Sequence, residues 1–232
     1  MDKKLIGRIG LALLAALIAA PAMAHGIGGK DAAFVAATKG VDLLPFVYLG
    51  AKHMVTGYDH LLFILGVVFF LYRMKHVALY VTLFSLGHSI TLLSGVLGQV
   101  HVNPYLVDAV IGLSVAYKAF DNLGGFKTVF GFQPDNRVAV LGFGLVHGFG
   151  LATKLQALRM SKDGLIANMV SFNVGVELGQ LLALSVMLGV ILLWRTSALF
   201  NRQAVAANAL ILFAGFLLMG YQLAGYFIGA RA

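Results

Sequence analysis

The chain alternates between long apolar runs and short polar segments. A helix needs about 20 mainly apolar residues to cross the hydrocarbon core of a bilayer. We therefore predict an all-α membrane protein with six transmembrane helices, preceded by a short helix at the membrane interface over residues 43–54. The six predicted spans cover about residues 57–72, 76–98, 104–120, 137–158, 165–194 and 204–228.

The six predicted spans form two groups of three, separated by a polar connection at residues 121–136. Many transporters consist of two such halves with inverted topology, so the order of the spans allows a 3+3 repeat. Small residues also recur at intervals of four, a spacing that lets membrane helices approach closely. Glycine is common in membrane helices in general, so this spacing alone does not establish a contact. The residues concerned are Gly144 with Gly148, and Ser171 with Gly175 and Gly179.

Residues 1–24 have the pattern of a cleaved signal peptide. Lys3, Lys4 and Arg8 precede an apolar stretch, and Ala22 and Ala24 form an Ala-x-Ala cleavage site. Cleavage there would place the mature N-terminus in the periplasm of a bacterium, with the spans in the inner membrane. The alternative is an uncleaved first helix. The predicted organisation is a signal peptide at 1–24, a periplasmic lead-in at 25–42 and a six-helix membrane domain at 43–232.

Composition supports the membrane assignment and narrows the function. Charged residues make up 11% of the chain, whereas soluble proteins contain about 25%. The chain has no cysteine, which excludes disulfides, thiolate metal ligands and cysteine nucleophiles. The basic residues behind the net charge of +8 lie at the ends of the apolar runs. We therefore expect contact with membrane lipid and none with nucleic acid.

The most informative residues are the ionisable ones inside the apolar runs. Such residues are costly in a bilayer and mark functional sites by default. Asp59 and His60 lie at the start of the first span, and His53 lies on the preceding turns, seven residues before His60, which puts both histidines on one helix face. One carboxylate and two imidazoles are suitable ligands for a divalent transition metal.

Three further spans carry polar residues near their middles. His88 lies in the second span and His147 in the fourth, while Asn173 and Glu177, the only glutamate of the chain, lie in the fifth. A single buried histidine is usually structural, but four helices with such residues at compatible depth predict one internal metal site. His25, as the mature N-terminus, is a plausible capture group. The predicted metal-binding residues are His25, His53, Asp59, His60, His88, His147, Asn173 and Glu177.

Four ordered motifs resemble the HupE/UreJ family of hydrogenase and urease accessory membrane proteins, and in particular its HupE/UreJ-like subgroup. The resemblance implies a six-span permease or accessory protein for nickel or cobalt. Metal-related roles would fall on His53, Asp59, His60, His88, His147 and Glu177. The segment from His53 to Asp59-His60 also resembles the signature of nickel/cobalt permeases, with one additional intervening residue. The motifs are GYDHLLF (57–63), LGHSIT (86–91), VHGFGLA (146–152) and FNVGVELGQ (172–180).

The leading prediction is a permease for a divalent transition metal, nickel or cobalt before copper or zinc. An accessory protein that donates metal to a metalloenzyme maturation or assembly partner would have the same sequence features. A haem protein with His88 and His147 as axial ligands is an alternative, as is an intramembrane metalloenzyme with Glu177 as base. The chain has neither an HExxH segment nor a nucleotide-binding loop, so we do not expect an enzyme.

Overall fold

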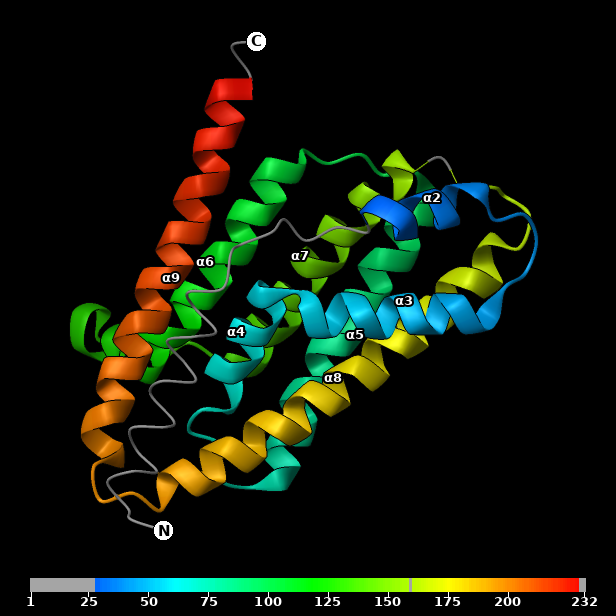
Figure 1. Ribbon diagram of the computed structural model, residues 1–232. Helices are drawn as coiled ribbons and strands as arrows, with labels where there is room; N and C mark the ends of the chain where they lie inside the picture. The colour runs from blue at the N-terminus through cyan, green and yellow to red at the C-terminus, as the bar shows by residue number, and fades with distance from the viewer. Residues whose placement is uncertain (1–27, 159, 230–232) are drawn as a thin grey trace.

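The computed structural model describes residues 28–158 and 160–229, and within these ranges the chain is helical and contains no strand (Figure 1). His25 and the predicted signal peptide lie outside the described residues. A long bundle of helices makes up the described part, and the connections between them are short. The helices are α2 (Gly29–Ala37), α3 (Leu43–Thr56), α4 (Tyr58–Val68), α5 (Met74–Gly98), α6 (Pro104–Asn122), η1 (Phe126–Phe130), α7 (Asn136–Ala157), α8 (Leu165–Arg195) and α9 (Phe200–Gly229).

Four helices of the described chain, α5, α7, α8 and α9, are long and apolar enough to cross a membrane. These correspond to the predicted second, fourth, fifth and sixth spans. The predicted first span is shorter than expected, because α4 contains 11 residues and is therefore about 16 Å long. The predicted third span, α6, contains 19 residues but also Asp108, Lys118 and Asp121, which lower its apolar character.

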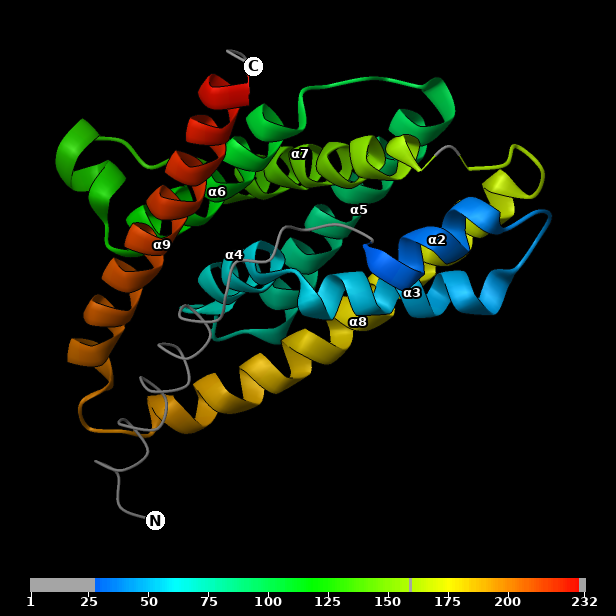
Figure 2. The ribbon, with the colours of Figure 1, turned by 45° about the horizontal axis from the view of Figure 1, so that its top comes forward.

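A break at Gly57 separates α3 from α4. The backbone of Gly57 is extended, with φ −77° and ψ 100°, and its N–H still donates to the carbonyl oxygen of His53. The chain changes direction at this point and α4 enters the middle of the bundle (Figure 2). Nine of the 11 residues of α4 are buried. Its N-terminal end therefore lies inside the protein, beside the C-terminal end of α3.

The bundle is built from three extensive helix pairs, α5 with α7, α6 with α9, and α3 with α8 (Figure 1). Glycines allow each pair to approach closely. A Cβ at Gly144 would lie 2.4 Å from the carbonyl oxygen of Phe84, and one at Gly175 would lie 2.0 Å from that of Val47. The small-residue spacing of α7 and α8 thus marks real contacts, the first with α5 and the second with α3.

The segment predicted as a periplasmic lead-in, residues 25–42, contains the helix α2. Lys52 of α3 donates a hydrogen bond to Asp31 of α2 at 2.7 Å, and the rings of Phe34 and Phe46 lie 6.2 Å apart. These contacts hold α2 against α3, so an ordered element precedes the membrane helices.

Candidate metal centre

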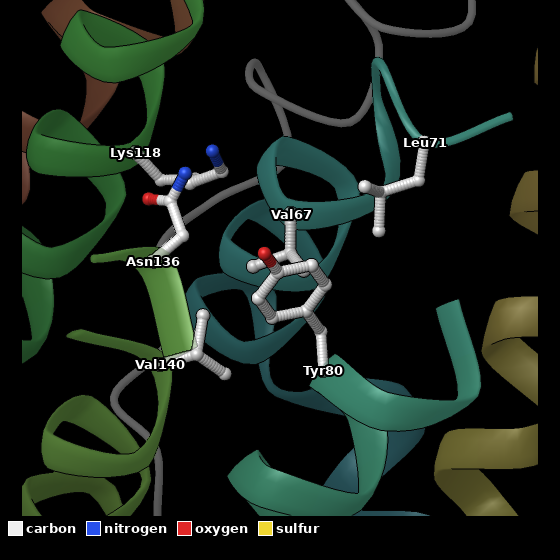
Figure 3. Close-up of a pocket in the computed structure, with 6 residues that line it drawn as sticks. All are labelled: Val67, Leu71, Tyr80, Lys118, Asn136 and Val140. Carbon is white, nitrogen blue, oxygen red and sulfur yellow. The ribbon is translucent and has the colours of Figure 1, made fainter. Parts of the chain in front are cut away.

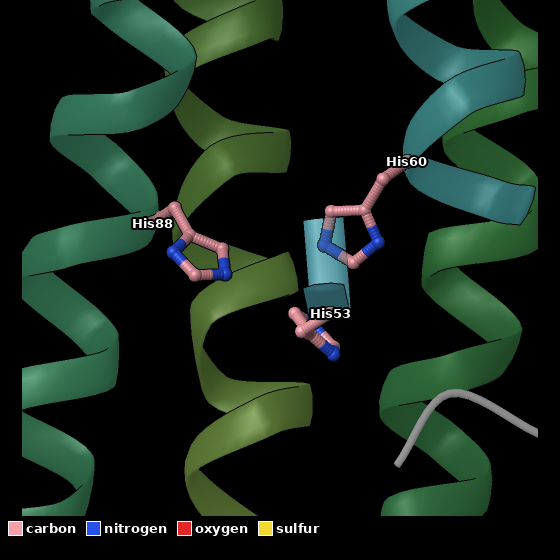
Figure 4. Close-up of side chains that lie close together, drawn as sticks. All are labelled: His53, His60 and His88. Atoms are coloured by element: carbon pink, nitrogen blue, oxygen red, sulfur yellow. The ribbon is translucent and has the colours of Figure 1, made fainter. Parts of the chain in front are cut away.

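Three buried histidines from three helices converge inside the bundle. His53 lies in the last turn of α3, His60 in the first turn of α4 and His88 in the middle of α5 (Figure 4). One ring nitrogen of each lies within 4.8 Å of one ring nitrogen of the other two. The break at Gly57 makes this possible, because it allows α3 and α4 to contribute histidines from different directions.

His147 of α7 adds a fourth imidazole to this cluster. Its ring centroid lies 4.9 Å from that of His60, whose own centroid is 5.2 Å from that of His53 and 5.9 Å from that of His88. All four side chains are buried, with exposed fractions of 7% or less. We call His53, His60, His88 and His147 the histidine cluster.

Two hydrogen bonds orient rings of the histidine cluster. The Asp59 carboxylate lies 2.7 Å from Nδ1 of His60, and the carbonyl oxygen of Phe143 lies 2.8 Å from Nδ1 of His147. A neutral imidazole that donates from Nδ1 carries its lone pair on Nε2, and such second contacts commonly hold metal-binding histidines in place. Asp59 therefore orients His60, and it also lines the cavity beside the cluster.

His88 differs from the other members of the histidine cluster. Among the described residues, neither of its ring nitrogens has a hydrogen-bond partner, although its side chain is 1% exposed. A buried polar group without a hydrogen bond costs about 1–3 kcal/mol. The ring would recover this cost by donating its lone pair to a metal ion.

Aromatic side chains exclude water from the histidine cluster. The ring of Phe84 lies 5.0 Å from that of His147 and 6.3 Å from that of His60, and Phe63 lies 5.5 Å from His147. Phe172 of α8 lies 6.1 Å from His53. These apolar walls lower the local dielectric constant and so strengthen the attraction between a cation and its ligands.

A cavity of about 10 Å³ borders the histidine cluster and includes an ion pair that the sequence analysis did not single out. Lys154 of α7 donates to both carboxylate oxygens of Asp108 of α6, at 2.9 and 3.1 Å. The seven-residue interval from His147 to Lys154 was a usable signal, because it puts both on one helix face. The cavity is lined by His53, Asp59, His60, Asp108, Ile111, His147, Gly150, Leu151 and Lys154.

Glu177 does not line this cavity. It is exposed and lines a separate groove of about 350 Å³ between α5 and α8, together with Ser85, Ser89 and Gln180. Gln180 accepts a hydrogen bond from Ser85 at 2.9 Å, which ties the two helices together. Asn173 is buried on α8, and neither atom of its amide has a hydrogen-bond partner among the described residues.

A further small cavity, of about 40 Å³, lies near the other end of α4 (Figure 3). It is bordered by Val67 at the end of α4, by Leu71 in the connection that follows and by Lys118 from α6. Lys118 is buried and pairs with Asp121 one turn later on the same helix. The short α4 therefore has the histidine cluster at its first turn and a buried lysine near its last.

Fold and site together define a helical membrane protein with a nitrogen-rich site in its interior. The family model described as "HupE / UreJ protein" matches residues 29–230, and the chain belongs to this family. Neither the curated proteins nor the solved structures contain a match to the chain. The family is associated with accessory or transport roles in nickel and cobalt handling.

Proposed function

We propose that the protein binds a divalent transition metal ion, nickel or cobalt, at the histidine cluster and passes it across the bacterial inner membrane. The ion is the cargo, and His53, His60, His88 and His147 are its ligands, with Asp59 orienting His60. The observation that carries this proposal is the convergence of four buried imidazoles from four helices, one of them without a hydrogen bond. Neutral imidazole suits nickel, cobalt, copper and zinc.

The proposed topology follows the sequence. A cleaved signal peptide places the mature N-terminus in the periplasm, and six membrane passages follow, with α4 and α6 as the first and third. His25, at the mature N-terminus, would capture the ion there. The discontinuous segment α3–α4 supports a transport role, since broken helices form the midplane binding sites of many transporters. Delivery of the ion to a metalloenzyme maturation partner uses the same site.

The geometry favours the metal site over the two alternatives. A haem needs a cavity several hundred Å³ in size, whereas the cavity at the histidine cluster measures about 10 Å³. The metalloenzyme hypothesis requires Glu177 as base, but Glu177 lines the groove between α5 and α8 and not the histidine cavity.

The test is metal binding and uptake by the purified protein. Wild-type protein in detergent should bind Ni²⁺ or Co²⁺, and in liposomes it should carry the ion inward. His60→Ala should reduce binding roughly a hundredfold, because it removes the imidazole at the centre of the cluster, a loss comparable to about 3 kcal/mol.

The matched control is His76→Ala, since His76 is exposed in the first turn of α5, outside the cluster. It should bind metal as the wild type does. Equal binding by wild type and His60→Ala would contradict the proposed site, and binding without uptake would favour the accessory role.

A further inference from the structure

Asp108 and Lys154 form an ion pair on the outer side of the histidine cavity. Their side chains are 10% and 20% exposed, whereas the side chains of Asp59 and His60 are 4% and 3% exposed. Asp108 lies in the second turn of α6 and Lys154 in the last turn of α7. Exposure therefore increases from the cluster toward this pair and the helix ends, which identifies the pair as the mouth of the cavity.

Lys154 holds a positive charge against the only carboxylate of the pair at the mouth. Nζ of Lys154 contacts both oxygens of Asp108, at 2.9 and 3.1 Å, so the carboxylate is engaged by an ammonium group. A carboxylate at this place would attract an incoming divalent cation, and an ammonium group would repel it. As long as the pair is closed, the attraction is largely cancelled.

We propose that Lys154 is a tethered cation that controls access to the histidine cluster, and that an incoming metal ion displaces it from Asp108. Asp108 then serves as the first oxygen ligand of the ion before the imidazoles receive it. When the ion has moved on, the ammonium group returns and closes the mouth. This inference rests on the proposed metal site and adds two residues that control how fast it is reached.

A purely structural role for the pair makes the opposite prediction. If Asp108 and Lys154 only hold α6 against α7, removing either charge can lower stability and metal binding but cannot accelerate binding. Faster association in a variant that lacks the pair is therefore specific to control of access.

The experiment follows Co²⁺, added as the chloride, by stopped-flow visible absorbance with the purified full-length protein in detergent. Lys154→Met should associate with Co²⁺ roughly tenfold faster than wild type, because local charge changes cation association rates by about this factor or more. Lys154→Arg keeps the charge and should resemble the wild type. Asp108→Asn leaves the ammonium group without its partner and should slow association roughly tenfold.

A double variant and a matched control complete the design. Asp108→Asn with Lys154→Met removes both charges and should associate more slowly than Lys154→Met, because it lacks the Asp108 carboxylate, but faster than Asp108→Asn, because the unpaired ammonium group is gone. It keeps the test valid if Lys154→Met alone fails to fold. Lys52→Met is the control, because Lys52 pairs with Asp31 at 2.7 Å outside the cavity. It should leave the association rate unchanged.

The inference would be overturned if Lys154→Met associates no faster than wild type and the double variant associates no faster than Asp108→Asn. His60→Ala separates this failure from that of the proposed function. If wild type binds Co²⁺ and His60→Ala does not, the metal site stands and only the role of Lys154 is lost. If wild type binds no Co²⁺, the metal site and the inference built on it both fall.

Discussion

Among single residues, His88 gives the clearest evidence for a metal-binding role rather than a structural one. A structural histidine inside a protein is normally held by hydrogen bonds. His88 has none among the described residues and is 1% exposed, in contact range of the Phe84 and His60 rings. Its imidazole therefore costs stability in the metal-free protein.

This cost leads to a prediction for His88→Leu. The variant should melt at the same temperature as the metal-free wild type or higher. It removes a buried polar group whose missing hydrogen bonds cost about 1–3 kcal/mol. Its Co²⁺ affinity should fall at least tenfold, since one ligand is lost. Thermal unfolding with and without Co²⁺ measures both effects.

His101→Asn provides the comparison, because His101 is exposed and bonded within its own loop. It should change neither the melting temperature nor the shift caused by Co²⁺. If His88→Leu melts at a lower temperature than wild type, and Co²⁺ raises its melting temperature as much as that of wild type, then His88 is structural.

Residue patterns predicted which side chains belong to the site, but they did not predict how those side chains are oriented. The histidines were recognisable because ionisable groups are rare in apolar runs. Their convergence depends on helix packing, which spacing along one helix does not determine. Asp59 is an example, because the sequence does not reveal that its carboxylate is hydrogen-bonded to the ring of the next residue, His60. Lys154 resembled an ordinary membrane-flanking lysine because its partner is 46 residues away.

The sequence predicted where the helices of the bundle lie. The apolar runs identified α5 to α9 as helices, with ends within a few residues of those observed. The predicted boundary between the helix at 43–54 and the span from 57 agrees with the break at Gly57, but the placement of His53 and His60 on one helix face assumed a continuous helix and was wrong. The break matters for the site, since it separates His53 on α3 from His60 on α4.

Close packing of α5 on α7 fixes the position of His88, and this predicts the effect of Gly148→Ala. A Cβ at Gly148 would lie 2.2 Å from the carbonyl oxygen of His88 and 2.2 Å from Oγ1 of Thr91. The helices must separate to accept it, which should cost about 1–3 kcal/mol. Co²⁺ affinity should fall as well, because His88 moves away from His60 and His147.

Gly142 on the same helix supplies the control. A Cβ there would meet nothing within 4 Å, so Gly142→Ala should raise stability by roughly 0.5–1 kcal/mol through helix propensity alone. Thermal unfolding measures the stability of both variants, and Co²⁺ titration measures their affinity for the ion. Equal behaviour of the two alanine variants would contradict the role of α5–α7 packing.

Across the whole molecule, the helix pairs have the pattern expected of two related halves. If α4, α5 and α6 correspond to α7, α8 and α9, with α3 as part of the first element, then the pair α5–α7 corresponds to α3–α8. The pair α6–α9 corresponds to itself. These are the three extensive pairs of the bundle, so the packing supports the 3+3 repeat that we propose from the order of the spans.

Glu177 lies in the groove between α5 and α8, which shares no lining residue with the histidine cavity, and this suggests separate roles in binding and movement. His88 of α5 belongs to the histidine cluster, while Ser85 and Ser89 beside it line the groove that contains Glu177. An ion that leaves the cluster along α5 would reach this groove. A carboxylate exposed on a membrane helix is costly unless a cation or proton neutralises it.

Glu177→Gln should therefore leave Co²⁺ binding in detergent unchanged but reduce uptake into liposomes at least tenfold. The reason is that the groove contains no member of the histidine cluster, so binding survives, whereas passage loses its carboxylate. Glu177→Asp keeps the charge and should retain part of the uptake. Loss of binding in Glu177→Gln would instead place Glu177 among the ligands. Unchanged binding and uptake together would mean that the groove is not on the path of the ion.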